Sequence, residues 1–179
     1  MTQIGNAYAQ GLYDLAKDEG LVDIILEEMN ALEIGFSQEP GFLRLLSASN
    51  LPKEERCRIL DDSFRGKLHP YLLNFLKILT EKGYARHFLD CCKAYREQFN
   101  EDNGILTVSA VTAVAMHPAQ IEKLTEKLGK LTGKTVQLMN RVDPECLGGV
   151  RLDYDGKWVD GTVRCRLDEI RTLLKNTVL

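Results

Sequence analysis

The sequence contains no apolar run that approaches the roughly 20 residues of a membrane-spanning helix. Its N-terminal residues also lack the basic start and apolar stretch of a signal peptide. Basic side chains are in the minority, with 23 Lys and Arg against 26 Asp and Glu and a net charge of -3. The chain therefore offers no broad positive field to nucleic acid. Because it lacks a membrane span and a signal peptide, we expect it to stay in the compartment where it is made.

Residues suited to metal or disulfide chemistry are few. The five cysteines are odd in number and include no C-x-x-C pair, which fits neither a secreted disulfide framework nor a zinc ribbon. The three histidines show no H-x-x-x-H spacing, so no metal site is expected. The adjacent Cys91 and Cys92 leave open a thiol switch on an adaptor protein, although a role as plain packing residues explains them more simply.

No catalytic constellation can be found. A G-x-S-x-G elbow is absent, and nothing nominates a Ser, His and Asp triad. Gly133-Lys134-Thr135 resembles the end of a phosphate-binding loop, but that motif needs glycine where this chain has Leu128, and it must follow a strand rather than a helix. A nucleotide-dependent enzyme that uses residues 129–135 is kept as an alternative, and no cofactor is predicted.

The first 103 residues do have a clear helical periodicity. Apolar residues recur three and four positions apart, and short turns containing glycine, proline or asparagine separate the segments. The pattern predicts about six helices, at residues 3–18, 21–37, 41–48, 53–66, 70–82 and 86–101. Such short connections favour antiparallel neighbours in a compact bundle.

The period changes to two after Asn103-Gly104, where β-branched residues predict a strand at 105–111. The next predicted elements are a helix opened by His117-Pro118 and stopped by Gly133, and a strand through Val136 and Leu138. A strand at 150–154 before the turn pair Asp155-Gly156 indicates a hairpin, and an amphipathic helix is predicted through Val163, Leu167, Ile170, Leu174 and Val178. The fold class is therefore α+β. An all-α bundle occupies residues 1–104, and a small α/β domain with a short β-sheet and two helices occupies residues 105–179.

Two helices have features that a bundle alone does not require. Between Tyr71 and Leu79 only two side chains are polar, so the apolar ones cover more than one face. In the first helix Ala7 and Gly11 lie four residues apart, and small residues at that spacing let another helix come close. A shallow groove between these two helices would suit an incoming amphipathic helix. Packing within the chain explains each feature separately and stays open as the alternative.

Charge is divided unevenly along the chain. Residues 1–103 hold 12 basic and 17 acidic side chains, whereas residues 104–179 hold 11 and 9. Within residues 1–39 eight acidic side chains accompany a single base, Lys17. The first two helices are therefore expected to present an acidic surface, which is either a solvated face or a docking surface for a basic partner.

Several blocks of sequence also resemble a known family. They are the opening Ala7-Tyr8-Ala9 helix, the helix with Leu73-Asn74-Phe75-Leu76 that closes at Gly83, Val108-Ser109-Ala110 before a helix bearing Gln120, the run from Val142 through Asp143-Pro144-Glu145-Cys146-Leu147-Gly148-Gly149 to Val150, and Val159-Asp160-Gly161-Thr162-Val163-Arg164 followed by Leu167. In this order the blocks span nearly the whole chain and resemble the delta subunits of F-type ATP synthase. The mitochondrial counterpart in that family is the oligomycin-sensitivity-conferring protein.

The resemblance implies a function without catalysis. Members of this family belong to the peripheral stalk, or stator, and join the catalytic head to the membrane-anchored stalk so that the head does not turn with the rotor. The N-terminal bundle is expected to receive the amphipathic N-terminal helices of the catalytic alpha subunits, and the C-terminal domain to hold the C-terminal ends of the b subunits. A start at Met1 without an Arg-rich transit segment favours a bacterial protein at the cytoplasmic face of the inner membrane, attached peripherally through its partners.

The expected interaction residues fall into two groups. Those of the N-terminal bundle that are expected to bind a partner are Ala7, Tyr8, Gly11, Leu12, Leu15, Phe75, Leu76 and Leu79. Those expected to define the fold or to lie on the stalk side are Gly148, Gly149, Asp160, Gly161 and Arg164. Adjacent glycines at 148 and 149 permit a close approach of a neighbouring segment, and Thr162 is expected to cap the last helix.

Overall fold

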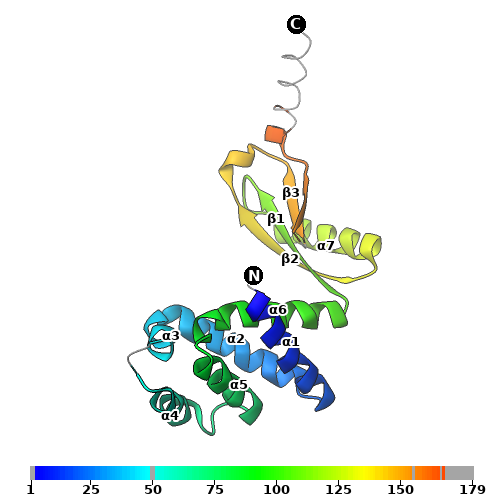
Figure 1. Cartoon of the computed structure of the whole chain (residues 1–179). Helices are drawn as coiled ribbons and strands as arrows, with labels where there is room; N and C mark the ends of the chain where they lie inside the picture. Colours follow the sequence, from blue (N-terminus) through cyan, green and yellow to red (C-terminus); the bar gives the residue numbers. More distant parts are fainter. Residues whose placement is uncertain (1–2, 49–50, 155, 166, 168–179) are drawn as a thin grey trace, which may run out of the picture. The chain divides into compact units, whose positions relative to one another are not determined.

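The computed structural model describes residues 3–48, 51–154, 156–165 and 167 of the 179-residue chain. It divides into two compact units, Met1–Phe99 and Asn100–Leu179 (Figure 1). We call them the helical unit and the α/β unit. The division falls within the sixth helix rather than at Gly104, where the sequence changes period.

The described residues of the helical unit form six α-helices, as the periodicity predicts, and one short 3-10 helix. Their bounds are α1 Gln3–Asp18, α2 Val22–Gln38, α3 Pro40–Leu46, α4 Lys53–Phe64, α5 Pro70–Glu81, η1 Ala85–His87 and α6 Phe88–Asp102. The sequence predicts each end to within a few residues, because the breaks coincide with turn residues. The one difference in type is at the start of the sixth helix, which opens with the 3-10 turn η1.

The end of α5 illustrates how sequence fixes a boundary in this unit. Gly83 adopts a left-handed φ of 77°, its N–H donates to the Thr80 carbonyl, and the Tyr84 N–H donates to the Leu79 carbonyl at 2.7 Å. This is the Schellman arrangement, which satisfies the last carbonyls of a helix and depends on a residue without a Cβ. The chain therefore leaves α5 at Gly83 and turns directly into η1.

One apolar core lies among the helices. In α1 the buried positions are Gly5, Ala9, Leu12, Tyr13 and Ala16, spaced three and four apart as one face of a helix requires. The largest side chains with almost no exposure include Tyr95, Phe88, Ile25, Met29 and Leu72. Rings pack edge to face across this core, for example Phe36 against Phe88 with centroids 5.3 Å apart.

In its described residues the α/β unit has a four-stranded sheet with the helix α7 packed against β2. Its elements are β1 Ile105–Thr112, α7 Pro118–Thr132, β2 Thr135–Val142, the 3-10 turn η2 Pro144–Cys146, β3 Val150–Tyr154 and β4 Lys157–Asp160. The strand order is β2-β1-β3-β4. β1 and β2 are parallel and are connected through α7, the crossover that parallel neighbours need, whereas β3 runs antiparallel to β1 and to β4.

The ends of α7 follow the predicted signals. The His117 ring accepts from the Ala119 N–H, and the Gln120 side chain accepts from the His117 N–H at 2.9 Å, which together cap the N-terminus. Gly133 ends the helix in the left-handed conformation at φ 68°.

The hairpin signal at Asp155-Gly156 is confirmed, because β3 and β4 pair antiparallel on either side of it. The sequence gives no bounds for β4, because two of its four residues are charged and the strand is too short to show a period. Most of the helix predicted through Val178, and Asp155 of the predicted turn, lie outside the described residues. Within the described residues, no helix combines the length and the apolar character that crossing a bilayer demands.

Candidate functional site

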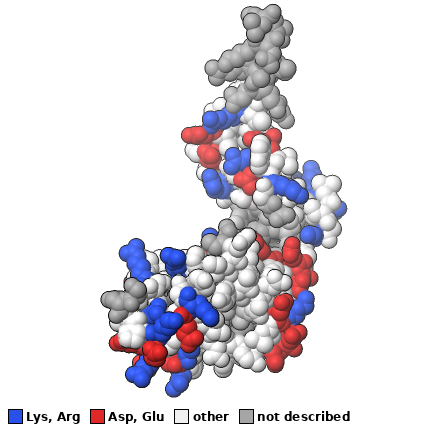
Figure 2. Space-filling view, viewed as in Figure 1, with Lys and Arg blue, Asp and Glu red and all other residues white. Residues whose placement is uncertain are grey.

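The predicted partner-binding residues separate into an exposed and a buried group. On α1, Ala7 and Gly11 are exposed and Leu15 is 41% exposed. On α5, which packs against α1, Ile78 is 46% exposed. We call these four residues the α1–α5 face. In the view of Figure 2 the helical unit shows a broad uncharged area, bordered by acidic side chains along one edge.

Four of the predicted partner-binding residues are buried in the core instead, so the prediction of an exposed position is wrong for them. Leu12, Phe75, Leu76 and Leu79 are between 1% and 6% exposed. The physical reason is that α5 is the central helix of the bundle, with Leu72, Leu73 and Thr80 buried as well. The apolar surplus between Tyr71 and Leu79 is therefore used mainly for packing within the chain.

Tyr8 has an intermediate position. Its side chain is half-buried and packs edge to face on Tyr84, with ring centroids 5.9 Å apart. This contact places the Tyr8 ring between α1 and the turn that follows α5. Tyr8 therefore joins the two elements that carry the α1–α5 face and keeps part of its ring at the surface.

Gly11 has no evident purpose within the chain. It lies inside α1, where glycine costs about 1 kcal/mol relative to alanine, and a Cβ built on it meets nothing within 4 Å. Its φ lies outside the left-handed region, so no turn requires it. This glycine destabilises the helix, and no turn or close contact within the chain requires it. Glycine at such a position instead permits the backbone of another segment to come close.

Ile78 belongs to the same face and was not among the predicted residues. A signal for it exists in the sequence, because Asn74 lies one helical turn earlier, and both residues are exposed. A polar side chain inside an apolar run marks the outward side of that helix.

The segment proposed for nucleotide binding has the wrong geometry. Gly133 ends α7, and Thr135 starts β2, so the segment lies at a helix C-terminus. A phosphate needs the N–H groups of a helix N-terminus, whereas a C-terminus presents carbonyl oxygens. The described residues also hold no group of three or more His, Cys, Asp or Glu side chains suited to a metal ion.

The adjacent thiols Cys91 and Cys92 are packed inside the helical unit. Each is at most 1% exposed, and burial raises the pKa of the Cys91 thiol to about 12. The pKa of Cys92 is raised as well, first by burial and then by the nearby Glu33 carboxylate. Reactive thiols need the opposite environment, exposed and electropositive.

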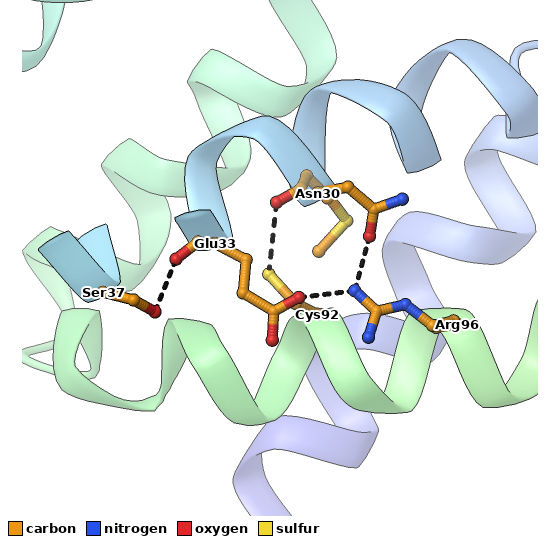
Figure 3. A network of polar contacts seen from close by, with 6 residues as sticks. Asn30, Glu33, Ser37, Cys92 and Arg96 are labelled. Atoms are coloured by element: carbon orange, nitrogen blue, oxygen red, sulfur yellow. Dashed lines mark hydrogen bonds and ion pairs between the residues drawn. The ribbon is translucent and has the colours of Figure 1, made fainter. Parts of the chain in front are cut away.

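Figure 3 shows the surroundings of Cys92 between α2 and α6. Its Sγ lies 3.8 Å from the Met29 carbonyl oxygen. Beside it, the Arg96 guanidinium of α6 donates to the side chains of Asn30 and Glu33 on α2. Cys92 is therefore part of the packing that joins these two helices.

We expect alkylation to distinguish these thiols. In the folded protein at pH 8, iodoacetamide should modify the half-buried Cys57 and Cys165 first, and Cys91 and Cys92 only after unfolding, because a thiol that stays protonated and buried reacts poorly. Mass mapping of the modified peptides over time measures this. Rapid modification of Cys91 without denaturant would restore the thiol-switch hypothesis.

The second group of predicted residues comes together at one end of the sheet. Gly149 has a φ of 80°, and a Cβ built on it would lie 2.5 Å from the Gly161 carbonyl oxygen. The Gly161 N–H donates to the Val150 carbonyl at 3.0 Å. The two glycines therefore let the segments before β3 and after β4 touch, which is the close approach that the sequence suggests.

The other residues of this group fix the start of the next helix. The Asp160 carboxylate accepts from the Thr162 N–H at 2.8 Å, and hydrogen bonding from the side chain and then the backbone of Thr162 lowers the pKa of this carboxyl. The Thr162 hydroxyl accepts from the Cys165 N–H at 3.2 Å, which is the predicted cap. Arg164 donates to Glu145 at 2.7 Å. All three residues hold local structure.

One face of the sheet carries a cavity of about 620 Å³ that the sequence does not suggest. Register places Ser109, Asp153 and Trp158 side by side on that face. An ion pair between Arg151 and Asp153, with Nε and Oδ1 3.1 Å apart, forms part of its lining. Trp158 is 68% exposed there. The arrangement is a polar surface with one aromatic wall.

Comparison with known proteins finds relatives over nearly the whole chain. The family model described as ATP synthase delta (OSCP) subunit matches residues 4–174. The chain is 31% identical over 173 residues to the ATP synthase subunit delta of Lactobacillus gasseri, covering 96% of this chain and 94% of that protein. It is 28% identical over 176 residues to the subunit of the same name from Clostridioides difficile, with 98% and 97% covered.

A solved structure has the same fold. A chain of the Toxoplasma gondii mitochondrial ATP synthase hexamer superposes with a TM-score of 0.74 over 97% of this chain and 98% of that chain, at 16% identity. At that identity the likeness concerns the fold, and the family rests on the match over nearly the full length. The chain therefore belongs to the ATP synthase delta (OSCP) subunit family and is a component of an ATP synthase.

Proposed function

We propose that this subunit is a non-catalytic connector of the peripheral stalk, which joins the catalytic head to the membrane-anchored stalk for rotary ATP synthesis driven by protons. Membership of the delta (OSCP) family supports this function. The division of the chain into two compact units supports it as well, because each unit can serve one partner. The subunit is a peripheral part of a membrane-bound complex, at the cytoplasmic face of the bacterial inner membrane.

On the head side, the α1–α5 face receives an amphipathic helix from the N-terminus of a catalytic alpha subunit. The observation that carries this proposal is Gly11, an exposed glycine in the middle of a helix with open space above it. Ala7 and Leu15 flank it at intervals of four residues, so a partner helix could lie along the stripe. Apolar helix faces of this kind bind amphipathic helices through anchors spaced by whole turns.

Charge indicates what kind of helix fits. Residues 1–39, which include α1 and α2, hold eight acidic residues. Those on α1 closest to the face in sequence, Asp14 and Asp18, are exposed. Acidic side chains beside an apolar stripe favour a partner with basic flanks, and they accelerate its association at low salt. The α/β unit serves the other partner, the C-terminal ends of the stalk b subunits.

Calorimetric titration of the full chain with the N-terminal segment of the cognate alpha subunit tests the head side. We expect saturable binding, and at least tenfold weaker binding for Gly11→Trp, because the indole would fill the space that the partner backbone needs. Gly35→Trp is the matched control, since Gly35 is also an exposed glycine within a helix, α2, and has no atom within 4 Å of a built Cβ.

The result is decisive only if both variants keep wild-type helicity, which circular dichroism measures. Equal affinity of Gly11→Trp and Gly35→Trp would remove the α1–α5 face from the proposal. No binding by the folded wild-type chain would contradict the proposed head contact altogether.

A further inference from the structure

Two helices of this chain begin with the same unusual cap, a histidine followed by a proline. At the start of α5, Nδ1 of His69 accepts from the Tyr71 N–H at 3.3 Å. At the start of α7, Nδ1 of His117 accepts from the Ala119 N–H, also at 3.3 Å. The common caps are Ser, Thr, Asp and Asn, which accept through a side-chain oxygen. A histidine cap differs from them because its acceptor is a ring nitrogen that can take up a proton.

Protonation of the ring removes a cap of this kind. A neutral imidazole has one donor and one acceptor nitrogen, whereas both nitrogens of the charged ring are donors. The first N–H groups of the helix then lose their acceptor, and the new positive charge is unfavourable beside the positive end of the helix dipole. Histidine side chains ordinarily change charge between about pH 5 and 8. A histidine cap therefore makes the start of a helix sensitive to acid, unless another group compensates.

The start of α5 has such compensation. The two carboxylate oxygens of Glu28, on α2, accept from the His69 N–H at 2.8 and 3.0 Å. A negative charge therefore stays at this helix N-terminus when the ring is protonated, which favours the helix. Much of α5 is also buried in the core, so tertiary packing holds this helix as well.

The start of α7 has neither form of support. The His117 N–H donates to the neutral side chain of Gln120 at 2.9 Å, and the first turn of α7 holds no acidic residue. All of α7 lies within the described residues, and none of its residues is buried. Because packing contributes little here, the stability of the first turns depends more on local interactions such as the cap.

The charged groups of the neighbouring elements do not replace the cap. β2, against which α7 packs, has one charged residue, Arg141, and it points to the opposite face of the strand from the buried Val136. β1 has no charged residue. Along α7 the first charged residues are Glu122 and Lys123, which have opposite signs and follow His117 by more than one turn.

The chain just before the cap is anchored by groups that do not titrate. The Met116 N–H donates to Oδ1 of Asn140 at 2.8 Å, and the amide nitrogen of Asn140 donates to the Thr112 hydroxyl at 2.9 Å. The nearest carboxylate after β2, that of Asp143, accepts from the Glu145 N–H instead. Acid should therefore act on the first turns of α7 and leave their attachment to the sheet in place.

We propose that His117 is a pH-sensitive cap, which holds the start of α7 while its ring is neutral and releases it when the ring is protonated. The start of α5 stays folded under the same conditions, because Glu28 supports it. The inference does not depend on the proposed function, since it concerns a helix end within the α/β unit. It makes the surface formed by the first turns of α7 a part of the chain whose order changes with pH.

Hydrogen–deuterium exchange of the full chain with millisecond labelling, at pH 7.5 and pH 5.0, tests this cap. Results are expressed as protection factors, which divide out the effect of pH on the exchange chemistry itself. We expect the amides in the first two turns of α7 to lose about fivefold in protection at pH 5.0, the factor that corresponds to a cap of about 1 kcal/mol. His117→Asn should keep its protection at both pH values, because the asparagine oxygen accepts at either one.

Two further variants make the result specific. His117→Ala, which lacks a cap at any pH, should already show the lower protection at pH 7.5. His69→Asn is the matched control, since it makes the same replacement in the other histidine cap, and it should leave the fall in α7 unchanged. Equal protection of α7 at the two pH values in the wild type would overturn the inference. So would a fall of the same size in His117→Asn, or a fall that extends equally to β1 and β2, because another group would then be the one that titrates.

Discussion

Replacing Gly149 with alanine is expected to destabilise the α/β unit by about 3 kcal/mol or more. Two costs add. Gly149 has a φ of 80°, which strains any residue with a Cβ. The new Cβ would also lie 2.5 Å from the Gly161 carbonyl oxygen and 3.0 Å from the Thr162 Cα. These are backbone atoms, which cannot rotate away as the end of a side chain can, so the segments before β3 and after β4 must separate.

Hydrogen–deuterium exchange measured by mass spectrometry locates this loss. In Gly149→Ala, amides of β3 and β4 should exchange faster, while peptides from the helical unit keep wild-type protection. Gly156→Ala is the matched control, because Gly156 shares the positive φ, 69°, but has no atom within 4 Å of a built Cβ. It should cost only the strain, about 1–2 kcal/mol. Equal protection in the two variants would mean that Gly149 and Gly161 do not touch.

In the same region, one feature of the backbone can be predicted from the sequence and another cannot. The adjacent glycines at 148 and 149 predict a close approach, because glycine is the residue that permits it, and the structure has that approach at Gly161. The sequence does not reveal that Leu147, before them, has a positive φ of 61° and is 66% exposed. Its conformation depends on the burial of Cys146 and on the contact with a segment after β4, both of which are tertiary.

In the helical unit the periodicity predicts the elements but not their burial. Helix ends such as Gly83 are set by local backbone chemistry and can be read directly. Which of the two apolar faces of α5 is covered depends on the helices packed around it. The sequence therefore predicts Phe75, Leu76 and Leu79 as partner contacts, whereas the structure buries them in the core. The outward Ile78 was missed for the same reason.

A second large effect is expected at Arg56, which the periodicity gives no reason to single out. Arg56 is on α4 and only 7% exposed. Its Nη1 donates to the Leu46 carbonyl at 2.8 Å, at the end of α3, and lies 3.5 Å from the Thr80 carbonyl oxygen in the last turn of α5. Carbonyls at helix C-termini carry partial negative charge, so a buried guanidinium is favourable there and ties three helices together.

Arg56→Met keeps most of the side-chain volume but removes these hydrogen bonds and leaves the Leu46 carbonyl buried without its donor. A hydrogen bond from a charged group contributes about 1.5–3 kcal/mol. We therefore expect the free energy of unfolding of the helical unit to fall by about 2–3 kcal/mol. For a unit of this size that lowers the unfolding temperature by roughly 8–24 °C, which circular dichroism at 222 nm can follow.

Removing a buried charge also removes its desolvation cost, which opposes this expectation. We expect the lost hydrogen bonds to cost more free energy than the removed desolvation returns, because methionine cannot donate to the Leu46 carbonyl as Arg56 does. Arg58→Met is the matched control, since Arg58 is exposed on the same helix. It should unfold within about 2–4 °C of wild type, because exposed substitutions change stability by at most about 0.5 kcal/mol. If Arg56→Met unfolds at the same temperature as Arg58→Met, desolvation balances the hydrogen bonds, and the guanidinium does not stabilise the junction of α3, α4 and α5.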